Sequence, residues 1–101
     1  MIDKTNEIDR IYELLNSDRL KDTEALLNSL FQSNPEDIEL LNLKGELFKK
    51  LGKYIEARDI FIKVKELSSP NIPIQVFLNL ADVHISLNEF DDAEFIYNNI
   101  I

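Results

Sequence analysis

Residues 45–61, GELFKKLGKYIEARDIF, decide the fold of this 101-residue chain. Gly52 stands between two segments whose apolar residues recur at helical spacing, and glycine adopts the left-handed backbone at a helix C-terminus most easily. Gly45 and Ala57 are small enough for two helices to approach closely, and Phe61 can fill the space between them. The stretch therefore predicts two antiparallel helices joined by a short turn.

The same ladder of residues occurs three times along the chain. After Gly45 it continues at offsets of 3, 7, 9, 12, 16 and 19 residues with Phe48, Gly52, Tyr54, Ala57, Phe61 and Val64. A copy 36 residues later contains Ala81, His84, Asn88, Phe90, Ala93, Tyr97 and Ile100, and a copy 34 residues earlier contains Ile11, Leu14, Asp18, Leu20, Thr23, Leu27 and Leu30. Three copies in register predict a repeat protein, with repeats at about 4–37, 38–71 and 74–101. Ile11 and Thr23 are larger than their counterparts, so the first two helices should cross at a wider or shifted position.

No segment alternates strictly between apolar and polar residues as a half-buried strand does, so the domain is predicted to be all-α. We place six helices at about 3–16, 20–32, 36–50, 54–67, 72–87 and 91–101. Asn34 is expected to cap the third helix, with Pro35 at its first position, and Gly52 and Asn88 to be left-handed. The ladder aromatics are expected to pack in the core; they are Tyr54, Phe61, Phe90 and Tyr97.

Composition and charge exclude several classes of function. A net charge of −8 disfavours nucleic acid and anionic membrane surfaces as partners. Charge is uneven: residues 4–37 carry −4, residues 38–71 carry +2, and residues 72–101, without any Lys or Arg, carry −5. The chain has no Cys, and neither a targeting signal nor a membrane-spanning run is recognisable. We expect one cytoplasmic domain, residues 1–101.

No group of residues forms a recognisable catalytic, cofactor or metal site. His84 takes the ladder position of Leu14 and Phe48, so packing between helices explains it better than catalysis or metal binding. Asp91 and Asp92 stand at a predicted helix start, where they stabilise the helix dipole; a metal site is the alternative. We therefore expect no enzymatic activity, no cofactor and no bound metal.

The ladder resembles the tetratricopeptide repeat, whose signature of about 34 residues places Gly, Tyr, Ala, Phe and Pro at fixed spacing. The stretch GELFKKLGKYIEARDIF follows that signature almost position for position, and ADVHISLNEFDDAEFIY follows it with Ala81 in place of the first Gly. The first copy departs from it at Ile11 and Thr23. The resemblance implies a right-handed α-α superhelix, or solenoid, of three antiparallel helix pairs.

In the family, the first helix of each repeat lines a concave groove that holds a peptide or a helix of a partner. The resemblance assigns this groove to Ile8, Tyr12, Glu39, Asn42, Glu46, Lys49, Gln75, Leu78, Asn79 and Asp82, with Thr5, Leu15, Asn16, Lys50, Ile85 and Ser86 on the same stripes. Family members that bind the acidic tail of cytosolic heat-shock chaperones carry Lys, Asn and Arg at positions occupied here by Ile8, Tyr12, Leu43, Gln75 and Asn79. These differences argue against that partner.

The implied function is a non-enzymatic protein–protein interaction scaffold with an unidentified protein or peptide partner. The alternative is a structural or self-association module. Family members usually add a capping helix, and without one the apolar face of Ile96, Ile100 and Ile101 would be exposed and would favour a homodimer. A third interpretation is a fragment of a longer protein whose activity lies outside this chain.

Overall fold

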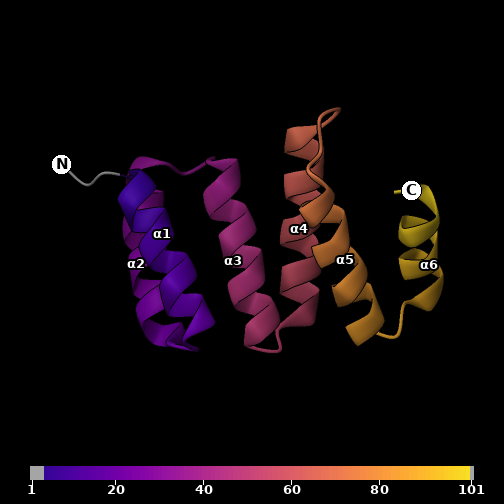
Figure 1. Cartoon of the computed structure of the whole chain (residues 1–101), viewed down its shortest axis with the longest axis horizontal. Helices are drawn as coiled ribbons and strands as arrows, with labels where there is room; N and C mark the ends of the chain where they lie inside the picture. The colour runs from indigo at the N-terminus through magenta and orange to yellow at the C-terminus, as the bar shows by residue number, and fades with distance from the viewer. Residues whose placement is uncertain (1–3, 101) are drawn as a thin grey trace.

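Six helices make up the regular structure of the described part of the chain (Figure 1). The computed structural model describes the backbone of residues 4–100 and the side chains of residues 6–100. The helices are α1 (Lys4–Asn16), α2 (Leu20–Ser33), α3 (Ile38–Lys50), α4 (Tyr54–Ser68), α5 (Ile74–Ser86) and α6 (Phe90–Asn99), and no strand occurs among these residues. The all-α prediction is confirmed. None of the six helices combines the length and the apolar character that crossing a membrane requires.

The helices pack as three antiparallel pairs, α1–α2, α3–α4 and α5–α6, placed side by side along the longest axis (Figure 1). The molecule measures 44 × 28 × 19 Å, and its first and last helix pairs lie at opposite ends of the row. Among the three pairs, α3–α4 packs most closely and α1–α2 least closely. The loose first pair agrees with the larger Ile11 and Thr23 in its ladder copy.

A left-handed residue ends the first helix of each pair. At the same ladder position, φ is 57° at Asp18, 76° at Gly52 and 62° at Asn88. The predicted left-handed conformations of Gly52 and Asn88 are therefore confirmed. Asp and Asn adopt this conformation more readily than other non-glycine residues, because their short polar side chains bond to the nearby backbone.

The start of α3 differs from the prediction. Asn34 ends α2 instead, where its backbone N–H and its Nδ2 both donate to the carbonyl oxygen of Leu30, at 3.1 and 3.0 Å. Asp37 has an extended backbone, and its Oδ1 accepts a hydrogen bond from the N–H of Leu40 at 3.0 Å. The predicted cap at Asn34 and Pro35 is wrong, because the carboxylate of Asp37 satisfies a free N–H group of the first turn.

The other helix limits follow the prediction with small shifts. α5 starts two residues late, at Ile74, because Pro73 is extended at its N-cap, with ψ at 141°. α6 starts one residue early, at Phe90, and ends at Asn99. The predicted helical positions 3 and 101, and the side chain of Thr5, lie outside the described residues.

Small residues stand where the two helices of a pair cross. A Cβ atom added to Gly45 would lie only 2.6 Å from Cε1 of Phe61, whose ring is fully buried. At the same ladder positions the first pair buries Ile11 together with Leu27, so a larger residue on the first helix accompanies a smaller one on the second. Ala57, Ala81 and Ala93 are buried as expected, with at most 3% of their surface exposed.

The core runs from pair to pair, and its last section is open. Phe61 and, in part, Tyr54 are buried against α5, which confirms their predicted place in the core. Phe90 and Tyr97 are 59% and 37% exposed, so the prediction is wrong for these two residues. The reason is their position in the row, because α6 contacts only α5 among the described helices and its outer side has no covering helix.

Candidate partner-binding groove

The first helices of the three pairs line one face of the molecule. α1 contacts α3 and α3 contacts α5, whereas the second helices, α2, α4 and α6, make no contact with one another within the described residues. A row of pairs that meet on one side and separate on the other is curved, with the first helices on the inner side. All ten residues predicted for the groove lie on α1, α3 and α5.

A hollow of about 340 Å³ lies on this face between α1 and α3. It is lined by Tyr12, Leu15, Asn16, Glu46, Lys49 and Lys50. The Tyr12 side chain is 41% exposed, and partial burial followed by the negative charges of Glu46 and Glu39 raises the pKa of its phenol. The hollow thus offers an aromatic ring, a carboxylate and two ammonium groups, which are groups that bind peptides through stacking and hydrogen bonds.

A polar network centred on Asn79 joins α3 to α5. Asn79 is only 1% exposed, and its Oδ1 accepts hydrogen bonds from Gln75 Nε2 at 3.1 Å and from Lys49 Nζ at 3.4 Å. Its Nδ2 donates to Glu46 Oε1 at 3.5 Å, and Lys49 Nζ also lies 3.5 Å from Asp82 Oδ2. Five of the predicted groove residues therefore form one connected patch across the two helices.

Glu46 is the electrostatically strained member of this patch. Burial raises the pKa of its carboxyl group, although the hydrogen bond from Asn79 and the charges of Lys49 and Lys50 act in the opposite direction. Lys49 is directed to Asp82 and Lys50 to Asp18, each at 3.5 Å. Within the described residues Glu46 is left without an ion pair, so its charged form is poorly compensated.

The predicted groove residues differ in how accessible they are. Ile8 is only 5% exposed and packs in the apolar cluster between α1, α2 and α3, so it serves the core and offers little surface to a partner. Leu78 and Asn42 are partly buried, and the buried Oδ1 of Asn42 accepts no hydrogen bond from the described residues. The exposed members are Tyr12, Glu39, Gln75 and Asp82.

His84 belongs to a separate cluster that joins the second pair to the third. The residue is 9% exposed, and its Nδ1 lies 2.8 Å from Glu89 Oε1, while Glu89 Oε2 accepts a hydrogen bond from Arg58 Nη1 at 2.8 Å. The hydrogen bond to His84, and then the charge of Arg58, lower the pKa of Glu89. A carboxylate of Asp92 lies within 4.8 Å of the ligand-type atoms of His84 and Glu89. Because both oxygens of Glu89 already have partners, one of them a cation, we interpret the cluster as a clamp between helix pairs.

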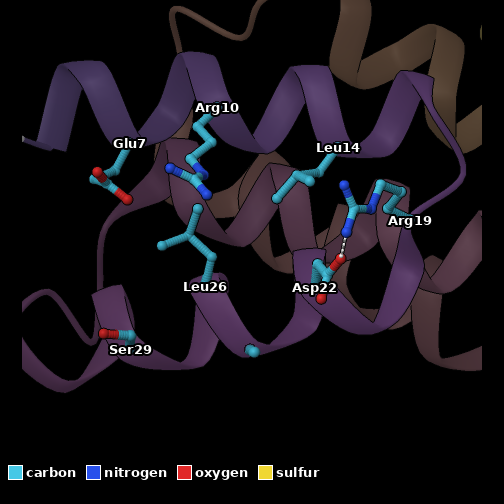
Figure 2. Close-up of a pocket in the computed structure, with 8 residues that line it drawn as sticks. Glu7, Arg10, Leu14, Arg19, Asp22, Leu26 and Ser29 are labelled. Atoms are coloured by element: carbon cyan, nitrogen blue, oxygen red, sulfur yellow. Dashed lines mark ion pairs between the residues drawn. The ribbon is translucent and has the colours of Figure 1, made fainter.

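A second hollow, of about 440 Å³, lies between α1 and α2 (Figure 2). It is lined by Glu7, Arg10, Leu14, Arg19, Asp22, Ala25, Leu26 and Ser29. Arg10 extends from α1 toward Leu26 of α2, and Arg19 pairs with Asp22 at 2.7 Å between exposed side chains. None of these residues belongs to the predicted groove. None of them is a buried member of the apolar cluster between the first pair and α3, although Leu26 packs against that cluster.

Comparison with known proteins supports the repeat interpretation. The family model described as the tetratricopeptide repeat matches residues 38–71, which contain α3 and α4. The human protein O-mannosyl-transferase TMTC3 is 31% identical over 78 residues, or 77% of this chain, and the chain spans about 8% of the length of that protein. No solved structure matches the chain. Tetratricopeptide repeats in general mediate protein–protein interactions. With a matching central repeat at residues 38–71 and three helix pairs in one row, the chain is a helical repeat protein that contains a tetratricopeptide repeat.

Proposed function

We propose that this chain is a non-enzymatic protein-interaction module that binds an extended peptide or a helix of a partner protein along the face of α1, α3 and α5. The observation that carries the proposal is the one-sided contact of the helices. The first helices touch one another and the second helices do not, which gives a concave surface that a segment can follow across all three pairs.

The chemistry of this face supports a polar peptide segment as its ligand. A segment lying across the groove meets the hollow beside Tyr12 at one end and the exposed Gln75 and Asp82 at the other. The hollow also contains Glu46, whose burial leaves its charge poorly compensated. A backbone N–H or a basic side chain of the segment would donate a hydrogen bond to this carboxylate and stabilise its charged form.

The transferase activity in the name of the human relative is not part of this proposal. The chain spans about 8% of that protein, so the activity of the whole protein is not carried over to it. The proposed role is recognition alone.

Peptide selection followed by matched variants tests the proposal. Random peptides of about twelve residues are selected on the immobilised chain, and their Kd values are measured with the wild type, with Tyr12→Ala/Asp82→Ala, and with Ile55→Ala/Phe95→Ala as the control. Both pairs consist of exposed residues, but the control pair lies on α4 and α6. The groove variant should weaken binding by about tenfold or more, and the control by less than about twofold.

Circular dichroism establishes that both double variants remain folded. If the selected peptides lose affinity for the control variant and keep it for the groove variant, the binding surface lies elsewhere and the proposal is wrong.

A further inference from the structure

The outer side of the last helix pair repeats the surface that the next pair covers elsewhere in the row. Leu27 and Phe61 are 1% and 0% exposed, whereas Tyr97, at the same ladder position, is 37% exposed. Tyr54 is partly buried, and its counterpart Phe90 is 59% exposed. We call the surface of Phe90, Glu94 and Tyr97 the end face. It has the residues of an interface between pairs, but no described helix packs on it.

The two internal interfaces define what fits such a face. In the interface with the first pair, α3 contributes Leu40, Leu43 and Leu47, which are at most 2% exposed. Over the second pair, α5 places Val76, Leu80 and Val83, which are at most 3% exposed. Both helices therefore present an apolar stripe with residues at i, i+3 or i+4, and i+7.

A second copy of this chain does not provide such a stripe from its first helix. The positions of α1 that correspond to the stripes of α3 and α5 hold Asn6, Asp9, Arg10 and Glu13, and all four are exposed. The hollow between α1 and α2 shows the same character, with the charged groups of Glu7 and Arg10 directed into it (Figure 2). Copies stacked head to tail would bury these charges against the apolar end face, at a high cost in free energy.

Charge also argues against two copies meeting through their end faces. Residues 72–101 contain five acidic residues and no Lys or Arg, so this contact would bring like charges together. Between the second and third pairs, Arg58 on α4 binds Glu89 at 2.8 Å. Glu89 is the N-cap residue of α6, in the turn that follows α5. The counterpart of Arg58 on the end face is Glu94, so the charge is reversed and a basic group of the incoming segment is needed to pair with it.

We propose that the end face binds a single amphipathic helix of a partner protein, whose apolar stripe is flanked by Lys or Arg residues. The apolar stripe covers Phe90 and Tyr97, and the basic flank pairs with Glu94. This surface is separate from the groove, so either proposal can fail without the other.

Two synthetic peptides derived from α3, Ile38–Lys50, provide the probes, because this segment carries the stripe of Leu40, Leu43 and Leu47. In the basic peptide Glu39 and Glu46 are replaced by Lys, and in the acidic peptide all three lysines are replaced by Glu. Fluorescence anisotropy measures the Kd of each peptide for the 101-residue chain. The basic peptide should bind at least about tenfold more tightly than the acidic one, and this preference should shrink as salt is raised.

Variants of the chain locate the binding surface. Tyr97→Lys should weaken the basic peptide by about tenfold or more, because a charge replaces part of the apolar surface. Glu94→Lys should weaken the basic peptide and strengthen the acidic one. Glu56→Lys is the matched control, because it makes the same change in net charge at an exposed position on α4 and should leave both affinities unchanged. Glu94 is itself exposed, so its variant folds even if Tyr97→Lys does not.

Each of three other results would overturn the proposal. Equal Kd values for the two peptides would show that the end face does not select a basic helix. Binding that Tyr12→Ala abolishes and Tyr97→Lys leaves intact would place the peptide in the groove. A dimer in light scattering that Tyr97→Lys converts to a monomer would make a second copy the occupant.

Discussion

Replacing Gly45 by alanine should destabilise this protein, although the same replacement stabilises most helices. Gly45 lies inside α3, where alanine is favoured over glycine by about 1 kcal/mol because the unfolded glycine backbone has more freedom to lose. The new Cβ would lie 2.6, 2.8 and 3.0 Å from Cε1, Cζ and Cδ1 of Phe61. The two effects oppose each other, and their sizes decide the sign.

The overlap is the larger effect, because the Phe61 ring is fully buried and cannot move into solvent. Overpacking of a well-filled core costs about 1 to 3 kcal/mol. With a central value of about 2 kcal/mol for the overlap and about 1 kcal/mol regained in helix propensity, the free energy of unfolding should fall by about 1 kcal/mol. For a chain of this length the Tm should drop by about 4 to 8 °C.

A double-mutant cycle isolates the cause. In the Phe61→Leu background, Gly45→Ala should raise the free energy of unfolding by up to about 1 kcal/mol, because a smaller side chain leaves room for the methyl group. The first helix pair shows a similar exchange, because Ile11 stands at the position of Gly45 and is buried together with Leu27 at the position of Phe61. Urea unfolding followed by circular dichroism gives all four free energies.

Gly52→Ala is the control, because nothing lies within 4 Å of the added Cβ and the strain comes from its φ of 76° alone. Gly52→Ala should lower the free energy of unfolding by about 1 to 2 kcal/mol both in the wild type and in the Phe61→Leu variant. If Gly45→Ala changes the free energy of unfolding by the same amount, and in the same direction, with and without the Phe61 ring, the reasoning fails. In that case the close approach of the ring does not explain why glycine is needed at this position.

Three further predictions concern single polar side chains. Asp37→Ala removes the hydrogen bond to the N–H of Leu40 and should cost about 1 kcal/mol in urea unfolding. The pKa of Glu89 is lowered in the folded protein, so its contribution to stability is present above its ordinary pKa of 4.5 and is lost as the pH falls through the lowered value. Between about pH 5 and about pH 3, the Tm of the wild type should therefore fall by more than the Tm of Glu89→Gln. For Glu46, burial raises the folded-state pKa, so stability is lost as the pH rises; Glu46→Gln should have a higher Tm than the wild type at neutral pH, and the difference should disappear at pH values below 4.5.

The repeat ladder predicted helix positions well because it records where two helices must touch. Gly52 and Asn88 mark the same left-handed turn in two copies, and the helices before and after them were placed to within one or two residues. The start of α3 was harder to predict. Asn34 and Asp37 are both good caps, and only the folded backbone shows that the oxygen of Asp37 reaches the N–H of Leu40.

The repeat pattern of the sequence could not predict which side chains are exposed or which form hydrogen-bond networks, because both depend on how neighbouring helices are placed. The ladder assigns Tyr97 the same position as Phe61, but burial depends on whether a further helix covers that position. The groove stripe assigned by resemblance likewise includes Ile8, whose side chain turns into the core. The network around Asn79 needs residues of α3 and α5 to meet, which depends on how the two helices are rotated against each other.

The linear order of the helices also has a consequence for hydrogen exchange. α3 contacts α1, α2, α4 and α5, whereas α6 contacts α5 alone among the described helices. Because the stability of such an array is nearly a sum over neighbouring units, amide protons of α3 should exchange only through global unfolding and those of α6 through local opening. Among the described residues, no helix of the first pair contacts a helix of the third pair directly. A segment bound from α1 to α5 would supply that missing link, and its binding should slow exchange at both ends of the row together.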